Sequence, residues 1–231
     1  MPENQDLIDR KDWDLHRAAK ESRVDIARAL IASGNNVNER VQEGAEPLHC
    51  AAYYNSLEMA LLLIEHGADI HSKADLDWTP LHCAAENNSF EVAQLLIDRG
   101  AAIDAIQENG WTSLHLTALQ DSLFVGKLLI ENGADVHLKT ELGETLLHCA
   151  AWHNSPEVAR LLIDRGVKID VKNKHGQTPL HLAVRKDSIA VAKLLIENGA
   201  DIDAMNKYGH TSRHWVMGSL EELSLNSTVA N

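Results

Sequence analysis

A histidine recurs at a fixed interval along almost the whole chain. Six glycines keep the same 33-residue period, at Gly34, Gly67, Gly100, Gly133, Gly166 and Gly199. A period of this length predicts a stack of equal units, because one such unit is too small to cover its own apolar faces. The histidines occur without insertion or deletion at His16, His49, His82, His115, His148, His181 and His214.

The sequence between the repeating histidines and glycines contains a motif that is typical of a known family. It reads WTPLHCAA from Trp78 to Ala85 and QTPLHLAV from Gln177 to Val184, and segments such as LLIEHGADI and LLIENGADI surround the glycines. In period and motif the chain resembles the ankyrin repeat. The resemblance implies an all-α fold, a solenoid of stacked helix-turn-helix units with connecting β-hairpin-like loops.

Each copy contains the start and stop signals of two helices. Thr79-Pro80 predicts the N-cap and first turn of a first helix. Asn88-Ser89 predicts a left-handed turn and then the N-cap of a second helix. The repeating glycine predicts the left-handed end of that second helix. The same paired signal recurs at Asn55-Ser56, Asp121-Ser122, Asn154-Ser155 and Asp187-Ser188.

The two end copies differ from the internal ones in the way that a finite stack requires. Arg17 is charged where the other copies have an apolar residue, and Arg213 stands where the others place leucine. A polar outer face is what terminal repeats need for solubility. The predicted organisation is a tail at 1–10, an N-capping copy at 11–40, internal copies at 41–73, 74–106, 107–139, 140–172 and 173–205, and a degenerate C-terminal cap and tail at 206–231.

The repeating histidines and the cysteines are interpreted as structural. Neighbouring helices lie roughly 8–10 Å apart, whereas the ligands of a zinc ion lie about 2 Å from it. Each histidine ring is therefore expected to bond to backbone of its own or the next loop. Cys50, Cys83 and Cys149 share one repeat position, which places them too far apart for a disulfide. They are expected to be reduced and buried, as in the cytosol or nucleus.

Composition narrows the function classes. The net charge of −13 disfavours nucleic-acid and membrane-surface binding, which need a positive field. The N-terminal MPENQDLIDRK has no apolar signal region, and no run of about 18 apolar residues suggests a membrane span. Because HExxH, GxSxG, phosphate-loop and CxxC patterns are missing, we expect no catalysis, no cofactor and no metal. The expected location is the cytoplasm, with the nucleus and delivery into a host cell left open.

The partner site is sought where the copies disagree. In ankyrin proteins, partners usually meet the concave side, which is made by the first helices and the loop tips. Most of the Trp and Tyr residues of this aromatic-poor chain fall on or near such positions, and these residue types dominate interface energies. The predicted partner-binding residues are Tyr53, Tyr54, Asp75, Trp78, Glu86, Asn87, Ile106, Trp111, Gln120, Lys139, Trp152, His153, Lys172, Lys174, Arg185 and Lys186.

Charge along this surface is uneven, with acidic residues in the middle and basic ones toward the C-terminus. This polarity suggests another protein with an acidic or phosphorylated segment as the partner. In the competing interpretation the tryptophans seal the stack and the lysines form an ordinary solvated face. The predicted function is a monomeric adaptor, inhibitor or effector. The alternatives are a structural or engineered scaffold and a regulatory subunit of an enzyme.

The loops depart from the family pattern in two respects. A position that is often aspartate in the family holds other residues, so weaker loop hydrogen bonding is expected. Asp77 replaces a glycine found in the other loops, so that turn is expected to be strained unless the aspartate accepts a positive φ. The loop position that is often aspartate in the family is occupied here by Val41, Ala74, Gln107, Thr140, Asn173 and Asn206.

Overall fold

The computed structural model describes residues 13–41 and 43–213, which divide into two compact units. The first unit ends at Glu108 and the second begins at Asn109. The tail predicted at 1–10 lies outside the described residues, as does the predicted C-terminal cap from residue 214 onward, including His214 and Trp215.

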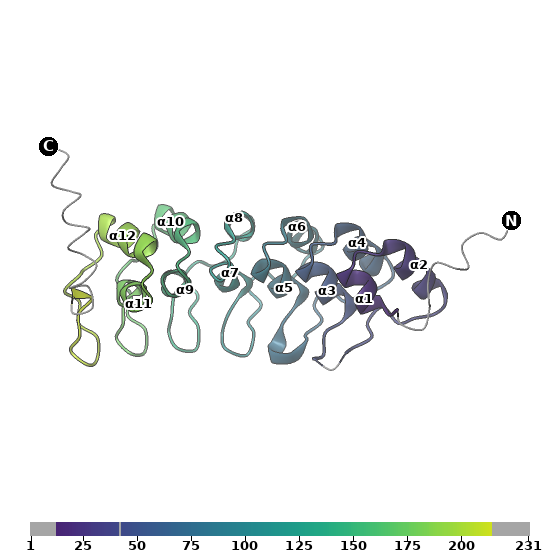
Figure 1. Cartoon of the computed structure of the whole chain (residues 1–231), viewed down its shortest axis with the longest axis horizontal. Helices are drawn as coiled ribbons and strands as arrows, with labels where there is room; N and C mark the ends of the chain where they lie inside the picture. The colour runs from purple at the N-terminus through teal and green to yellow at the C-terminus, as the bar shows by residue number, and fades with distance from the viewer. Residues whose placement is uncertain (1–12, 42, 214–231) are drawn as a thin grey trace. The chain divides into compact units, whose positions relative to one another are not determined.

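The first unit consists of paired antiparallel helices. In each pair a short first helix is followed by a longer second helix. The first helix of one pair contacts the first helices of the neighbouring pairs, as α3 does with α1 and α5 (Figure 1). A 3-10 turn, η2, lies in the loop before α5. The elements are α1 (Leu15–Lys20), α2 (Val24–Ala32), α3 (Pro47–Tyr53), α4 (Leu57–Glu65), η2 (Asp75–Asp77), α5 (Pro80–Glu86) and α6 (Phe90–Asp98).

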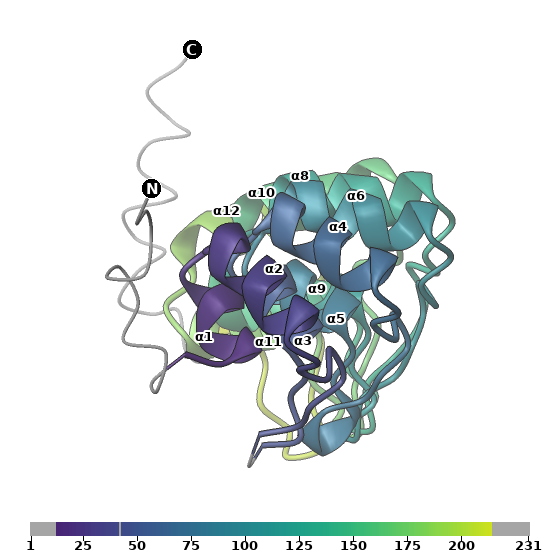
Figure 2. The same ribbon diagram turned by 90° about the vertical axis from the view of Figure 1, so that its right-hand side faces the viewer.

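The second unit repeats the same arrangement. Its first helices α9 and α11 pack together, as do its second helices α10 and α12 (Figure 2). In α7, Thr117 replaces the usual alanine, and its hydroxyl donates to the Leu114 carbonyl at 2.7 Å as the helix ends. The elements are α7 (Ser113–Leu116), α8 (Leu123–Glu131), α9 (Leu146–His153), α10 (Pro156–Asp164), α11 (Pro179–Arg185) and α12 (Ile189–Glu197).

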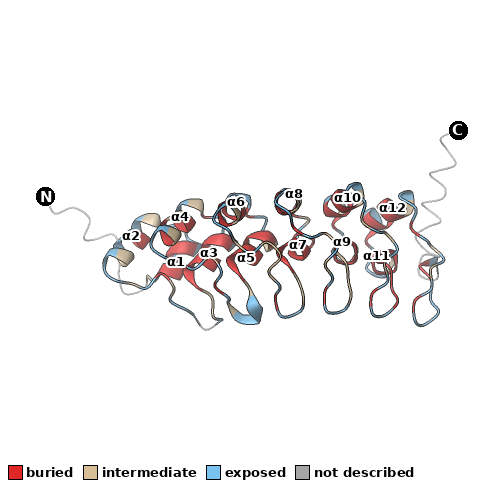
Figure 3. Ribbon diagram, turned by 180° about the vertical axis from the view of Figure 1, so that it is seen from behind, coloured by how far each residue is buried: buried red, intermediate tan, exposed pale blue. Residues whose placement is uncertain are grey.

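The described residues are helical, without a strand or sheet, and the all-α prediction is confirmed. The loops are closed by single backbone bonds across their bases, such as Ala74 N–H to the Trp78 carbonyl at 2.8 Å and Thr140 N–H to the Glu144 carbonyl at 2.9 Å. Figure 3 shows buried residues concentrated on the helices and exposed ones on the loops. None of the described helices is long and apolar enough to cross a membrane.

The predicted start of the first helix is confirmed at Thr79. The Thr79 hydroxyl accepts from the His82 N–H, and the Thr79 N–H donates to Nδ1 of His82 at 3.1 Å. Two groups at the helix end therefore satisfy each other reciprocally. The same box recurs at Thr112, Thr145 and Thr178.

The other ring nitrogen of these histidines reaches a neighbouring loop. Because Nδ1 accepts a bond from an N–H, the ring proton is on Nε2, which donates to a backbone carbonyl. His115 is the exception, since its Nε2 makes no bond of ordinary geometry within the described residues, although the Leu138 backbone still opposes the lowering of the ring's pKa by burial. The bonds join His16 to Ala45 at 3.0 Å, His49 to Trp78 at 3.1 Å, His82 to Ala105 at 3.0 Å, His148 to Gln177 at 2.9 Å and His181 to His210 at 3.1 Å.

The start of the second helix confirms one prediction and corrects another. Asn55 and Asp121 take the expected positive φ, 52° and 51°. The serines occupy the N-cap positions, but their side chains do not cap. The helix α10 is capped instead by Asp121 of the preceding copy, which accepts from Val158 N–H at 2.9 Å and Glu157 N–H at 3.2 Å. Ser155 turns its hydroxyl to the Ala118 carbonyl.

Neighbouring loops are joined near their tips by a repeated backbone bond. In the second unit Glu141 N–H donates to the Asn109 carbonyl at 3.2 Å, and Lys174 N–H donates to the Leu142 carbonyl at 2.9 Å. Gly110 permits this approach, since its φ is 76° and a Cβ there would lie 2.7 Å from the Glu141 nitrogen. Each loop tip is thus held in a fixed position relative to the next loop by a backbone hydrogen bond.

The prediction of weaker loop bonding is wrong for the last two loops. The Asn173 side chain accepts from the His175 and Gln177 N–H groups at 2.9 and 3.0 Å. Asn206 accepts from the Tyr208 and His210 N–H groups at 2.8 and 3.1 Å. Asparagine replaces aspartate here because its amide oxygen has the same reach.

Asp77 accepts the positive φ that the sequence analysis named as the way to avoid strain, and its neighbour Leu76 takes one as well. Asp77 has a φ of 62° and Leu76 a φ of 59°, and both lie in η2. An aspartate tolerates this region better than a bulky apolar residue does. The strain is therefore concentrated in Leu76, which is 53% exposed.

The cysteines are free, as predicted, but only one of them is fully buried. Cys149 is buried, whereas Cys50 and Cys83 are half-buried. Burial raises the pKa of all three thiols above the ordinary range. The expectation of uniform burial was wrong for the first unit, whereas Cys149 is buried as are Leu116 and Leu182 at the same repeat position.

Replacement of Asp121 tests the cap between copies. Asp121→Ala should lower the free energy of unfolding by about 1 kcal/mol or more, because two N–H groups of α10 lose their acceptor and alanine tolerates the positive φ poorly. Asp121→Gly removes the same cap but also relieves the positive φ, so it should cost less. Equal stability of the wild type and the alanine variant in urea denaturation would contradict the capping role.

Replacement of Leu76 tests the strained loop. Leu76→Gly should raise the free energy of unfolding by about 0.5–1 kcal/mol, because a cost of about 1–2 kcal/mol for a left-handed residue exceeds the added chain entropy of glycine. Leu142 occupies the same loop position without a positive φ. Leu142→Gly is therefore the matched control and should bring no gain in the same denaturation experiment.

The titration of His148 should make stability depend on pH. Burial lowers its pKa from 6.5 to about 4, against an opposing bond from the Gln177 carbonyl. Because the unfolded chain binds the proton first, the contribution of His148 is complete above about pH 6.5 and falls by about 3 kcal/mol toward pH 4. NMR titration should show a neutral imidazole at pH 5, and a midpoint near 6.5 would contradict this.

Candidate protein-binding surfaces

The predicted aromatic residues of the first unit lie at the end of α3. Tyr53 and Tyr54 are exposed and meet edge to face, with ring centroids 5.1 Å apart. The Lys20 ammonium lies 5.8 Å from the Tyr54 ring. The Asn87 side chain donates to the Tyr53 carbonyl at 2.6 Å. The tyrosines are therefore accessible and held in place by polar contacts from both neighbouring copies.

The remaining predicted residues of the first unit are spread over α5 and its loops. Trp78 is half-buried against the His82 ring, with centroids 6.2 Å apart. Asp75 and Ile106 are exposed on the loops. Glu86 is half-buried, and desolvation raises the pKa of its carboxyl group. These side chains do not line either of the hollows described below.

In the second unit, several predicted residues converge on one hollow of about 470 Å³. It lies between the first helices α9 and α11 and the loops that precede them. We call its lining the tryptophan surface, which comprises Trp111, Leu142, Glu144, Cys149, Trp152, His153, His175, Gln177, Arg185 and Tyr208, together with the adjoining Lys186.

Trp152 holds two cations on this surface. The Arg185 guanidinium carbon lies 4.6 Å from the centroid of the indole, and the Lys186 ammonium lies 4.0 Å from it. Cation–π contacts of this kind are worth about 0.5–1 kcal/mol when exposed. Trp152 therefore serves as a platform that restricts both side chains, a role that the sequence analysis did not assign to it.

Trp111 is packed by histidine rings on this surface. Its centroid lies 6.1 Å from that of His115 and 6.4 Å from that of His153, the latter edge to face. Burial lowers the pKa of His153, and the charge of Lys186 lowers it further. Both effects favour the neutral form of His153.

One acid stands on the same surface. Burial raises the pKa of Glu144, and this effect is opposed by a bond from Asn173 and by the charges of His175 and Arg185. Glu144 thus adds one acidic group to the lining, within reach of the charge of Arg185.

Four predicted residues of the second unit do not line the tryptophan surface. Lys139 lines a different hollow. Lys172 donates its ammonium to the Met205 carbonyl at 2.7 Å, which gives it a role in joining loops. Gln120 and Lys174 are exposed outside the lining.

Two apolar residues of the lining were missing from the predicted set. Leu142 is 51% exposed and Tyr208 is 68% exposed. Both stand directly before a loop glycine, and this position could have identified them. A second signal was also available, since Trp152 and Arg185 are one period apart and residues at the same position of adjacent copies are neighbours.

The arrangement provides surfaces for contact. Within residues 13–41 and 43–213, no three His, Cys, Asp or Glu side chains approach closely enough to hold a metal ion. The features that do converge are an exposed leucine and tyrosine, two tryptophans and two oriented cations. These residue types are enriched in protein interfaces.

Comparison with known proteins agrees with this architecture. One family model of ankyrin repeats (3 copies) matches residues 114–206, and another of ankyrin repeats (many copies) matches 15–64 and 48–97. A comparison with curated protein sequences finds no match. Among solved structures, the chain is similar to the crystal structure of the human ASB11 ankyrin repeat domain, with 24% identity and a TM-score of 0.77.

That structural likeness covers 87% of this chain and 90% of the other, and at this identity it concerns the fold. Ankyrin repeats generally mediate protein–protein interaction, and proteins built from them are typically modules without enzymatic activity. The matched segments together span most of the described residues, in both units. The chain belongs to the ankyrin-repeat family.

Proposed function

We propose that this chain is a non-enzymatic adaptor, inhibitor or effector that binds an acidic or phosphorylated segment of a partner protein at the tryptophan surface. The observation that carries the proposal is the placement of Arg185 and Lys186 on the Trp152 ring. The chain as a whole carries a net charge of −13, so two oriented cations beside a hollow are a local reversal of charge.

Preorganisation supports an anionic ligand. A free lysine or arginine loses rotamer freedom when it binds, and that loss weakens exposed ion pairs. Trp152 has already restricted both side chains, so less freedom remains to be lost on binding. The Arg185 guanidinium can also pair with a carboxylate or phosphate through two parallel hydrogen bonds.

The neighbouring apolar residues support a peptide rather than a free anion. Leu142 and Tyr208 stand exposed beside the hollow, and Trp111 forms part of its wall. A partner side chain placed there would bury apolar surface while its acidic neighbour pairs with Arg185. Interfaces commonly combine such a central apolar anchor with charged contacts at the rim.

Glu144 supports one orientation of the segment. Its carboxylate would repel an acidic residue, so the acidic part of the partner is favoured near Arg185 and Lys186 and disfavoured near Glu144. Charge complementarity of this kind contributes to specificity and association rate more than to affinity. The proposal includes a monomer acting in the cytoplasm, for which the free thiols Cys50, Cys83 and Cys149 give support.

Charge reversal tests the proposal. Arg185→Glu with Lys186→Glu should reduce retention of the partner from cell lysate by about tenfold or more at low salt, because an attractive contact becomes repulsive. Retention is measured by affinity pull-down with quantitative mass spectrometry. Lys193→Glu on α12 is the matched control, since Lys193 is exposed and lies outside the hollow.

A second arm separates carboxylate from phosphate. Phosphatase treatment of the lysate should abolish retention if the segment is phosphorylated and leave it unchanged if the segment is acidic by sequence. Circular dichroism must first show equal folding of all variants. Undiminished retention by the double variant, with the control also unchanged, would rule out the tryptophan surface as the site.

A further inference from the structure

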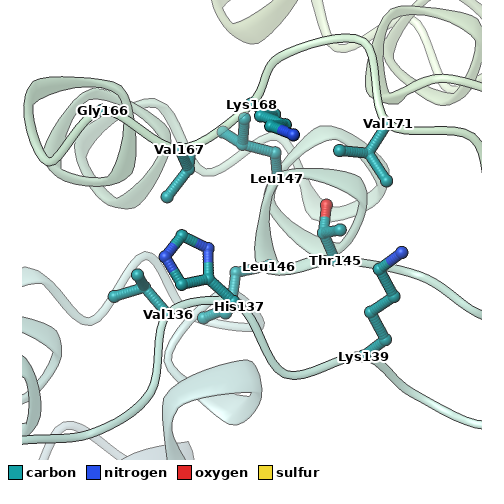
Figure 4. Close-up of a pocket in the computed structure, with 10 residues that line it drawn as sticks. All are labelled: Val136, His137, Lys139, Thr145, Leu146, Leu147, Gly166, Val167, Lys168 and Val171. Atoms are coloured by element: carbon teal, nitrogen blue, oxygen red, sulfur yellow. The ribbon is translucent and has the colours of Figure 1, made fainter.

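A second hollow in the unit that begins at Asn109 has no part in the proposed function. It measures about 390 Å³ and shares no lining residue with the tryptophan surface. Figure 4 shows it between two loop segments, one around His137 and Lys139 and the other around Val167 and Lys168. Its walls are largely aliphatic, formed by Val136, Leu146, Leu147, Val167 and Val171.

The sequence departs from its own repeat at this hollow. Residues 167–168 read Val-Lys, whereas the same two positions read Ala-Asp at 68–69, 134–135 and 200–201. Position 168 is Asn, Asp or Ala in the other copies, so Lys168 is the one cation there. The departure consists of two adjacent residues, and both line the hollow.

The departure gives up a structural hydrogen bond. In the copies that have Asp here, its side chain accepts from the backbone N–H two residues later, as Asp69 does from His71 at 2.8 Å and Asp135 from His137 at 2.8 Å, whereas Ala102 cannot make this bond. Lysine has no acceptor, so Lys168 cannot stabilise its turn in this way. A residue that gives up a turn-stabilising hydrogen bond and brings no other structural stabilisation is expected at a functional position.

The two replacements add what a ligand site needs. Val167 enlarges the aliphatic wall, and Lys168 brings a second ammonium group to a hollow that already holds Lys139. In Figure 4 the two ammonium groups lie on either side of Thr145 and Val171. The Thr145 hydroxyl lies 2.9 Å from Nδ1 of His148 and donates its proton there. The side-chain donors of the lining that remain for an anion are Lys139, Lys168 and the ring of His137.

We infer that this hollow is a second protein-binding site, which takes an acidic–aliphatic segment with its carboxylate on Lys139 and Lys168 and its aliphatic side chain between Val136, Val167 and Val171. A peptide is favoured over a small molecule because the hollow is open between surface loops. Small ligands need a site that encloses most of their surface, whereas a partner protein supplies its own cover. The inference rests on the proposed function only in taking the chain to bind proteins.

The probe for this site is the acetylated, amidated tripeptide Ile-Glu-Val, titrated into the isotope-labelled full chain. The backbone amide signals of Val136, Lys139, Val167, Lys168 and Val171 should shift and saturate. The neutral analogue Ile-Gln-Val should bind about tenfold more weakly, since the loss of a charge-assisted hydrogen bond corresponds to about that factor.

The double variant Val167→Ala, Lys168→Asp restores the residues found in the other copies, so it should fold normally. It should weaken binding of Ile-Glu-Val by at least about tenfold, because one cation becomes an anion. Lys127→Asp is the matched control, since Lys127 is an exposed lysine on α8 outside both hollows, and its affinity should be unchanged.

Three results would overturn the inference: no saturable shift at these amides, equal affinity of the double variant and wild type, or binding of octanoate but not of Ile-Glu-Val, which would mark a site for small carboxylates. Arg185→Glu with Lys186→Glu should leave binding of Ile-Glu-Val unchanged. Failure at one surface is therefore distinguishable from failure at the other.

Discussion

The interaction on which the stack depends is the double hydrogen bond of the repeating imidazole. Nδ1 of His148 accepts from the start of its own helix, and Nε2 donates to the carbonyl of Gln177 in the next loop. Nδ1 can accept only while the ring is neutral, and burial keeps it so. One side chain thus sets a helix start and places the following loop against it.

Because the histidine rings and backbone bonds position the loops, the side chains at the loop tips can differ from copy to copy. Within each unit the loops are positioned by histidine rings and by backbone bonds between neighbouring tips. The side chain before the loop glycine takes no part in those bonds, and it is Leu142 in one loop, His175 in the next and Tyr208 in the one after. Surface chemistry can change at such positions while the framework stays constant.

The sequence alone predicted what is encoded locally. The period, the Thr79 N-cap and the left-handed residues such as Asn55 depend on neighbours a few residues away, and all appear in the structure. The cap from Asp121 to α10 did not follow, because it joins residues 36 and 37 positions apart. A serine at an N-cap position is a strong local signal that the contact between copies overrides.

The candidate surfaces were predicted in composition but not in geometry. Trp152, Arg185 and Lys186 were all in the predicted set, yet their stacking depends on the packing of α9 against α11. Lys139 was predicted to lie in the same groove as Trp152, but it lines the second hollow, together with Val136 and Lys168. The 33-residue period shows which position of the repeat a residue occupies, but it does not show in which direction its side chain points.

The bonds between neighbouring loop tips also limit how such a chain can change in length. Each tip donates to a carbonyl about one period earlier, as Lys174 does to Leu142, so a residue added to or lost from one loop would misalign the bonds that this loop makes with its neighbours. A gain or loss of a complete 33-residue copy would restore the same pairs. Growth by whole copies is therefore the path of variation that this architecture leaves open.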